Sequence, residues 1–331
     1  MKKISKFIVI DIKSIFLILG ILAALWVAFL LKTVLIAIFI ATIIALGLDP
    51  AVQFLKRKKL SQGVAVAVVY SAFVITILGS ITFAATPIVS QTQDLGKNFS
   101  TYLESLSNIP ELKNFSIDLN QEITKQVSAI SGQAVQKTLD AFAALVMGIT
   151  VLVLTAYLLL DFEGVRKNIL ALVPKPHREQ TAEIIASIEE KLGMWLRGQI
   201  ALMLVIGTVT FVGLTILDVK FALSLAVIAG LLEVVPMIGP TISVIPALIV
   251  GFSDSSFKGL GVLGLYIIIQ QLENNFVVPK VMQKAVGFNP LVTLIAILVG
   301  GNLMGVLGAI LAIPIALIGQ TIIKSVFENL Y

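Results

Sequence analysis

The sequence predicts an all-α, polytopic membrane protein with about six full spans and two helical hairpins that are interrupted by glycine and proline. Three observations favour this fold class. Hydrophobic residues make up 58% of the 331 residues and only 13% are charged, with a mean hydropathy of +1.02. Soluble domains are nearer to a quarter charged. Several uncharged runs reach the roughly 20 residues that one helix needs to cross a bilayer, and two further stretches are broken by Gly and Pro.

The composition also excludes several kinds of site. The chain has no cysteine and a single histidine, His177, so disulfides and zinc centres are not expected. It has no Ser/His/Asp set and no phosphate-binding loop, which argues against an enzyme. The net charge of +5 does not indicate a nucleic-acid partner, because the basic residues flank apolar runs as membrane-orientation signals do. The lipid bilayer is the expected surrounding.

The N-terminal region, residues 1–87, is expected to contribute membrane spans. Its uncharged runs are 14–31, 33–48 and the first part of 60–93. Lysines precede the first run, and the KRKK segment 56–59 follows the second. By the positive-inside rule both flanks are cytoplasmic, so we expect the first two runs to form a hairpin and both chain termini to lie in the cytoplasm. The first run lacks a small-residue cleavage site, which predicts an uncleaved helix.

Two polar segments separate the following spans, which are expected at 141–160 and 198–217. Residues 88–140 have apolar residues at helix-like intervals and predict an extracytoplasmic amphipathic segment, either a solvated cap or a gate. Residues 161–197 predict a cytoplasmic amphipathic helix. Its glutamates are expected to face solvent, opposite an apolar stripe of Ile184, Ile185, Ile188 and Leu192.

Two stretches near the C-terminus do not fit one straight span each. Residues 285–323 carry no charge and would extend about 58 Å as one helix, nearly twice the hydrocarbon thickness. The GGNLMG segment interrupts this stretch. Residues 221–253 have Glu233 as their only charge and are interrupted by VPMIGP. We therefore predict two hairpins, 221–252 and 290–320, with unwound tips at membrane depth.

The predicted topology lets these hairpins enter from opposite membrane faces. Span 198–217 leads outward, which places Asp218 and Lys220 in a short outer turn, and span 259–278 returns inward. Paired broken helices of opposite orientation could form an inverted repeat, which is typical of secondary transporters with a substrate site near the midplane. We interpret residues 141–331 as a transport core.

Polar residues of this core form the candidate substrate or ion path. A carboxylate at the first tip must face a cavity, find a donor or hold a proton. The i, i+3 and i+4 spacing of Gln270, Glu273 and Asn274 places them on one helix face. The full candidate path is Glu233, Pro236, Gly239, Pro240, Gln270, Glu273, Asn274, Asn275 and Asn302. The candidate hinge or tip residues are Gly300, Gly301, Gly305, Gly308 and Pro314.

A structural role stays open for the same side chains. Glu233 could bond backbone groups that are freed at the tip, and Glu273 could be a charge near the membrane surface. The neighbouring amides could simply hold helices together. No cofactor or metal site is expected, and the candidate coupling ions are H⁺ and Na⁺.

Four segments, in this order, resemble the autoinducer-2 exporter family of bacterial membrane transporters. They are RGQ (197–199), EVVPMIGPTISVIPA (233–247), QQLENNFVVPKVMQKAVGFNPL (270–291) and GGNLMGVLGAILAIPIA (300–316). The family's Glu-x-x-Pro-x-x-Gly-Pro segment is matched by Glu233, Pro236, Gly239 and Pro240. Its Gln-x-x-Glu-Asn segment is matched by Gln270, Glu273 and Asn274. The family's His-Pro pair is Asn289-Pro290 here, so any role of that histidine is absent.

The resemblance implies a multi-spanning homo-oligomer of the bacterial inner membrane, with a pentamer as one candidate assembly. Family members are linked with export of the quorum-sensing signal autoinducer-2, and others with sodium/proton antiport. We therefore expect export of a small polar metabolite or signal such as autoinducer-2, coupled to an ion gradient. The alternative is Na⁺(Li⁺)/H⁺ antiport, in which Glu233, together with Glu273, carries the ion.

Overall fold

The computed structural model describes residues 12–79, 134–236, 238–282 and 290–328. Every regular element within these ranges is helical, which confirms the all-α class. The expected extracytoplasmic segment lies outside the described residues except for its last seven positions, which begin α5. Four described helices are long and apolar enough to cross a membrane, or five if the bent pair α5–α6 is one span. The count of six spans and the inverted repeat stay predictions.

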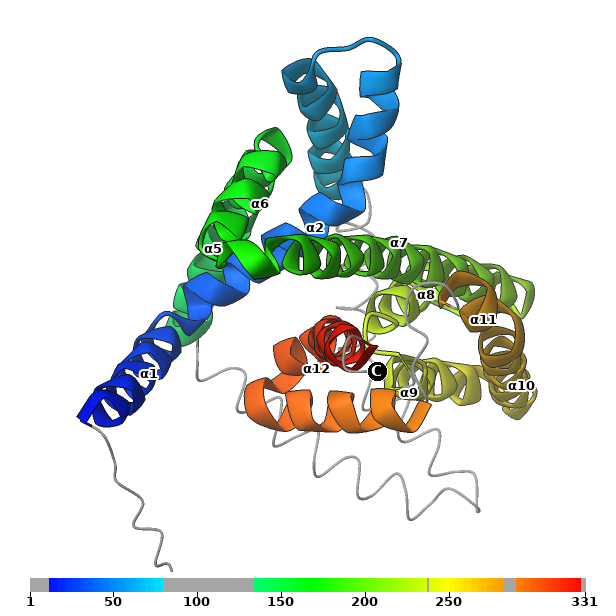
Figure 1. Ribbon diagram of the computed structural model, residues 1–331. Coiled ribbons are helices and arrows are strands. Elements are labelled where there is room, and N and C mark those ends of the chain that lie inside the picture. The colour runs from blue at the N-terminus through cyan, green and yellow to red at the C-terminus, as the bar shows by residue number, and fades with distance from the viewer. Residues whose placement is uncertain (1–11, 80–133, 237, 283–289, 329–331) are drawn as a thin grey trace, which may run out of the picture.

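An N-terminal group of helices surrounds α2 (Figure 1). It comprises α1 (Ile12–Leu30), α2 (Lys32–Arg57), a helix over 62–79, α5 (Ala134–Leu160) and α6 (Phe162–Ala171). Only Leu31 separates α1 from α2, and the helical bond from the Leu31 amide to the Val27 carbonyl continues across this point. The expected hairpin of the first two runs is therefore wrong, because one turn residue with helical hydrogen bonds on both sides does not reverse the chain.

Small apolar residues join α2 to its neighbours. Ala45 and Ala65 are fully buried in a cluster that links α2 with the 62–79 helix and α5. The Tyr70 hydroxyl donates a 2.8 Å hydrogen bond to the Leu152 carbonyl and so connects the 62–79 helix to α5. Close approach between small residues is the usual way in which membrane helices associate.

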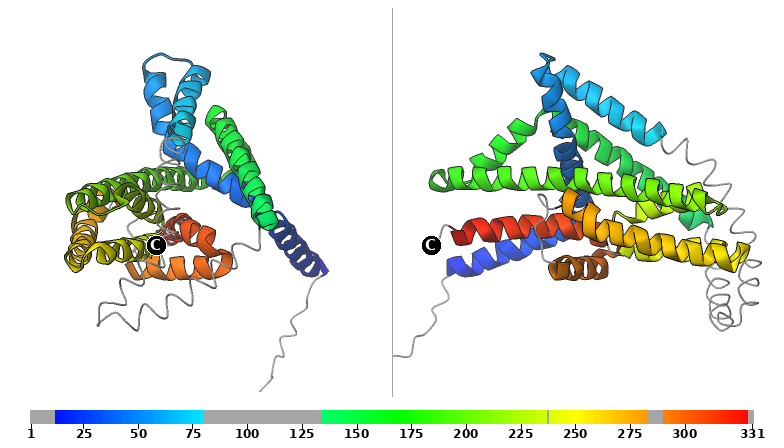
Figure 2. Two further views of the ribbon diagram at one scale, coloured as in Figure 1. Left: turned by 180° about the vertical axis from the view of Figure 1, so that it is seen from behind. Right: turned by 90° about the vertical axis from the view of Figure 1, so that its right-hand side faces the viewer.

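A C-terminal group is arranged along α7, which is 39 residues long (Figures 1 and 2). In the right-hand view of Figure 2, α7, α10 and the C-terminal arm of α12 run in roughly the same direction. The elements are η2 (Lys175–His177), α7 (Arg178–Ile216), α8 (Ala222–Leu232), α9 (Ile238–Asp254), α10 (Ser256–Leu272), η3 (Glu273–Val277), α11 (Val278–Met282) and α12 (Pro290–Glu328).

The segment expected as one cytoplasmic helix, 161–197, is divided. Its residues form α6, η2 and the first half of α7, and α7 then continues without a break into the expected span 198–217. The apolar stripe expected to lie on the membrane packs partly within the protein. Leu192 is 2% exposed in the main hydrophobic cluster, and Ile188 packs against that cluster.

Two bends position the candidate site. The chain folds back between the end of α8 at Leu232 and the start of α9 at Ile238, and α12 leaves helical geometry at Met304 and Gly305, within the GGNLMG segment. The main hydrophobic cluster joins the first bend to the surrounding helices. It contains Val235 from that bend together with Leu46 of α2, Trp195 of α7 and Leu317 of α12.

Candidate functional site

Glu233 occupies the first position of the sharp turn between α8 and α9, and its side chain is 0% exposed. Pro236 cannot continue the helical hydrogen-bond pattern because it lacks an amide proton. Gly239 allows the start of α9 to fold against the end of α8, since a methyl group there would overlap the Leu232 carbonyl. Pro240 lies in the first turn of α9, where a missing amide proton costs little. These residues hold the glutamate inside the protein.

Gln199 of α7 fixes the backbone of this turn. Its Nε2 donates a 2.7 Å hydrogen bond to the Glu233 carbonyl, and the side chain is 1% exposed. Trp195 lies one turn earlier on the same face of α7 and is 3% exposed. Sequence reasoning used Gln199 only as part of the RGQ resemblance and did not consider Trp195. The signal available was a polar residue at the end of a charged helix segment, just inside an uncharged run.

Glu273 approaches from a different element and is 1% exposed. It begins η3, a π-helix in which the Val278 amide donates to the Glu273 carbonyl five residues earlier. Such single-turn π segments are often found at functional sites. Glu273 is close enough to Glu233 for the two carboxyl groups to interact electrostatically. Val277 and Val278, at the end of this segment, pack against the cluster that contains Val235.

The polar atoms of this buried site lack hydrogen-bond partners among the residues that the structure describes. They are both carboxylate oxygens of Glu233, Oε2 of Glu273, Oε1 of Gln199 and Nε1 of Trp195. Four of these five atoms are acceptors, so the described residues supply neither enough hydrogen-bond donors nor a cation to match them. A buried carboxylate without a donor is costly, and a proton or a bound cation relieves that cost. The described ranges contain no group of three His, Cys, Asp or Glu residues suited to a metal ion.

The amides next to Glu273 do not join the buried pair. Gln270 is half-buried, Asn274 is exposed, and the exposed Asn275 donates 2.9 Å hydrogen bonds back to Gln271. Of Gln270, Glu273 and Asn274, which were expected to share one helix face, only Glu273 is fully buried.

The second bend contributes no side chain to the buried site. Asn302 is exposed, as are Leu303 and Met304 beside it. The two arms of α12 meet through glycine, since a methyl group on Gly300 would overlap the Gly308 carbonyl and one on Gly308 would overlap that of Gly300. Gly305 has a φ of 62°, a left-handed conformation that favours glycine. Gly301 lies next to this contact, and Pro314 lies inside the second arm.

Arg197, the first residue of the RGQ segment, joins α7 to α2. Its Nη1 lies 3.3 Å from the Leu46 carbonyl and 3.4 Å from that of Gly47. The helical donor for the Leu46 carbonyl would be residue 50, which is a proline and has none. Arg197 therefore satisfies a carbonyl that Pro50 leaves free. A cavity of about 380 Å³ opens beside it between α2, α6 and α7.

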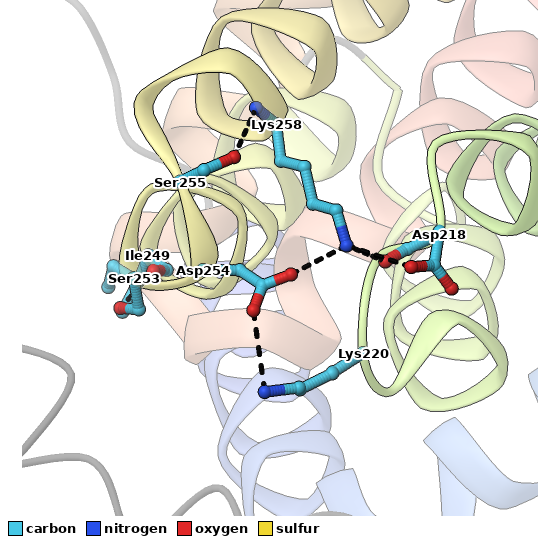
Figure 3. Close-up of polar contacts among 7 residues, drawn as sticks. All are labelled: Asp218, Lys220, Ile249, Ser253, Asp254, Ser255 and Lys258. Atoms are coloured by element: carbon cyan, nitrogen blue, oxygen red, sulfur yellow. Dashed lines mark hydrogen bonds and ion pairs between the residues drawn. The ribbon is translucent and has the colours of Figure 1, made fainter.

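The opposite end of the C-terminal group carries a cluster of ion pairs (Figure 3). Lys258 Nζ lies 2.6 Å from Asp254 Oδ2 and 3.0 Å from Asp218 Oδ2, and it donates a 2.6 Å bond to the Asp218 carbonyl. Lys220 lies 3.4 Å from Asp254 Oδ1. The hydrogen bond from Lys258 lowers the pKa of Asp254, despite partial burial, and raises that of Lys258. Asp218 and Lys220 thus lie in a short turn, as the sequence predicts.

Comparison with known proteins adds independent information. The family described as "AI-2E family transporter" matches residues 15–328. The YueF protein of Bacillus subtilis is 26% identical over 319 residues, covering 91% of this chain and 85% of YueF. A sodium-lithium/proton antiporter of Halobacillus andaensis is 27% identical, with coverage of 90% and 91%. The AI-2 transport protein TqsA of Escherichia coli is 23% identical, with coverage of 86% and 84%.

Proposed function

This chain belongs to the AI-2E family of transporters, and from that premise we propose that it exchanges a monovalent cation for protons at Glu233 and Glu273. We place it in the bacterial inner membrane as a multi-pass homo-oligomer. Cation/proton antiport, the alternative that the sequence suggests, is thereby placed before export of a small polar solute. The reason is that the buried acceptors favour an ion or a proton over a larger polar solute.

One observation carries the proposal. Two carboxyl groups from separate elements, 0% and 1% exposed, lie within electrostatic reach of each other, and three of their oxygens have no donor in the described part of the chain. Two like charges cannot both stay ionised and unpaired at such a place without a large cost. The pair therefore gains from binding either a proton or a cation, which is the competition that antiport requires.

The elements that carry the two carboxyl groups provide a way to couple ion or proton binding to a change of conformation. Glu233 lies at the bend between α8 and α9, and Glu273 lies on a π-helix between α10 and α11. Gln199 contacts the Glu233 backbone but leaves its own Oε1 unpaired, so an amide oxygen is available beside the carboxylates. Oxygen ligands of this kind suit Na⁺ and Li⁺. The similarity to a sodium-lithium/proton antiporter over 90% of the chain supports this reading.

Export of a small polar solute, such as autoinducer-2, is the second candidate. The similarity to an AI-2 transport protein favours it. So does the row of exposed amides at Gln271, Asn274 and Asn275, which could bind a hydroxyl-rich molecule beside the carboxyl pair. In this reading the two glutamates supply the ion coupling and the amides contact the solute.

The test is proton movement in proteoliposomes with a trapped pH dye and an imposed Na⁺ gradient. The parent protein is compared with Glu233→Gln and Glu273→Gln, which keep the side-chain volume but remove the negative charge. We expect sodium-driven proton movement in the parent and its loss in both variants. Glu183→Gln, at an exposed position of α7, is the matched control and should behave as the parent does.

The same proton-movement measurement separates cation/proton exchange from export of a small solute. If the parent moves no protons under Na⁺ or Li⁺ gradients while eluting as a homogeneous folded protein, cation/proton exchange is excluded. Uptake of a labelled small solute into inside-out vesicles then tests the exporter reading. Full exchange activity in Glu233→Gln and Glu273→Gln would instead move the ion site elsewhere in the chain.

A further inference from the structure

The ion-pair cluster of Figure 3 joins two turns that are distant in sequence. One turn connects α7 to α8 and contains Asp218, and the other connects α9 to α10 at Ser255, directly after Asp254 ends α9. Lys258 bridges them, because its ammonium group contacts the Asp218 carbonyl, the Asp218 carboxylate and the Asp254 carboxylate. One side chain therefore uses its three donors to hold both turns together.

The α7–α8 turn is held in an unfavourable backbone conformation. Asp218 has a φ of 51° and Phe221 a φ of 62°, although neither is glycine. Left-handed backbone is uncommon for such residues, and Phe is less suited to it than Asp. The Lys258 bond to the Asp218 carbonyl stabilises this turn. When the bond breaks, the turn is free to relax.

An apolar plug lies beneath the cluster. Leu214 of α7, Leu225 of α8, Val250 of α9 and Val262 of α10 are each at most 2% exposed in one hydrophobic cluster. Along α10 the plug residue Val262 lies between Lys258 and Glu273. Glu273 is 15 residues beyond Lys258, which corresponds to roughly 22 Å along a helix.

We propose that Asp218, Asp254 and Lys258 form an ionic gate that closes this end of the α7–α10 unit and opens during transport. The charge pattern predicts that this end is the outer one. The inference rests on the transport function, because a gate needs a path to close. Exposed ion pairs are weak and are screened by salt, so they can break on the timescale of a transport cycle. A permanent clamp would be better built from buried apolar contacts.

The first experiment measures access to the plug and does not depend on which solute moves. The chain has no native cysteine, so Val250→Cys provides a single thiol beneath the gate. In proteoliposomes, labelling by a membrane-impermeant thiol reagent should be slow. Adding Lys258→Met should raise the labelling rate roughly fivefold or more, as expected for the loss of several weak ion pairs. Lys258→Arg, which keeps the charge, should restore much of the protection.

Two controls distinguish the opening of the ionic gate from a general destabilisation of the fold: a change of ionic strength and a matched lysine variant. Choline chloride should accelerate labelling in the Val250→Cys background but add little once Lys258→Met is present. Lys167→Met, at an exposed position of α6, should leave the rate unchanged. Equal labelling with and without Lys258→Met would overturn the proposal. So would acceleration by Lys167→Met of the same size.

The second experiment asks whether the gate must open. Asp218→Cys and Lys258→Cys are combined and bridged by a short bifunctional thiosulfonate reagent. We expect bridging to abolish the ion exchange of the same protein and a reducing agent to restore it. Undiminished exchange in the bridged protein would show a fixed clamp. Absence of exchange in the unbridged parent would count against the proposed function, and the labelling result would still decide the gate.

Discussion

The two bends of the C-terminal group place their polar residues in opposite surroundings. At the α8–α9 bend, Glu233 is 0% exposed and its backbone carbonyl is held by Gln199. At the α12 bend, Asn302 is exposed and Leu303 is 76% exposed. Both bends depend on glycine, but only the first contributes a bend residue, Val235, to the main hydrophobic cluster. The difference agrees with the proposal that the ion site lies at the first bend, and it leaves the second bend with no buried polar side chain among residues 300–305.

Glycine substitutions should produce the largest effects, because they test the shape of both bends. A methyl group at Gly239 or Gly308 would overlap a backbone carbonyl, so Gly239→Ala and Gly308→Ala should each destabilise by about 3 kcal/mol or more. Thermal unfolding in detergent measures the change. Gly319→Ala is the control, since nothing lies within 4 Å of the added methyl group. Equal stability of all three variants would contradict the close approach at both bends.

Removing the polar group of each bend should separate their roles. Glu233→Gln should lower the sodium-dependent proton flux by at least about 100-fold, because it removes a charge from a buried ion site. Asn302→Ala should change that flux by less than about twofold, as surface substitutions usually do. Initial rates of the pH-dye signal provide the measurement. A similar loss in both variants would mean that the second bend also contacts the transported ion.

Gln199 provides a smaller test of the first bend alone. Gln199→Leu keeps the volume but leaves the Glu233 carbonyl without its 2.7 Å hydrogen bond. The loss should cost about 1–3 kcal/mol of stability, the usual cost of a buried carbonyl left unpaired. Thr210→Val serves as a comparison, because the Thr210 hydroxyl is buried without a partner in the described residues. That variant should be neutral or stabilising, and thermal unfolding decides between these outcomes.

The smallest effect concerns the ion pairs far from both bends. Because the folded pKa of Asp254 is lowered, its stabilisation is present above the ordinary carboxyl pKa of 3.8 and is lost as pH falls through the lowered value. Asp254→Asn should therefore destabilise at pH 7 by less than about 1 kcal/mol, and this difference should shrink as the pH falls below the ordinary carboxyl pKa. Melting temperatures across this pH range test the sign. A difference that grows on acidification would refute it.

Sequence patterns predicted the helical class and the presence of Glu233 in a glycine- and proline-broken turn. Charge and periodicity suffice for this, because a lone carboxylate in an uncharged run must be shielded. They could not reveal that Gln199 and Trp195 complete the site. Those residues lie 34 and 38 positions before Glu233, and only the packing of α7 against α8 brings them near.

The errors have local physical causes. The hairpin of the first two runs was inferred from basic residues, which report on membrane sides and do not show whether a turn exists. Leu31 makes helical hydrogen bonds on both sides, so the chain does not reverse there. The α-helical spacing of Gln270, Glu273 and Asn274 indicates a helix face but not how deeply each side chain is buried, and only Glu273 is fully buried. The sequence QQLENNF does not distinguish an α turn from a π turn, because the conformation of the turn depends on the residues that pack against the helix.

The π-helix also acts as a one-residue insertion. An α-helix advances 100° per residue, so one extra residue rotates everything after the π turn by about that angle relative to α10. Removing any one residue between Glu273 and Val277 would restore a plain α-helix and turn α11 by a quarter of a circle. Val278, which now packs against the main hydrophobic cluster, would then be rotated away from it, although both ends of the segment would keep their composition.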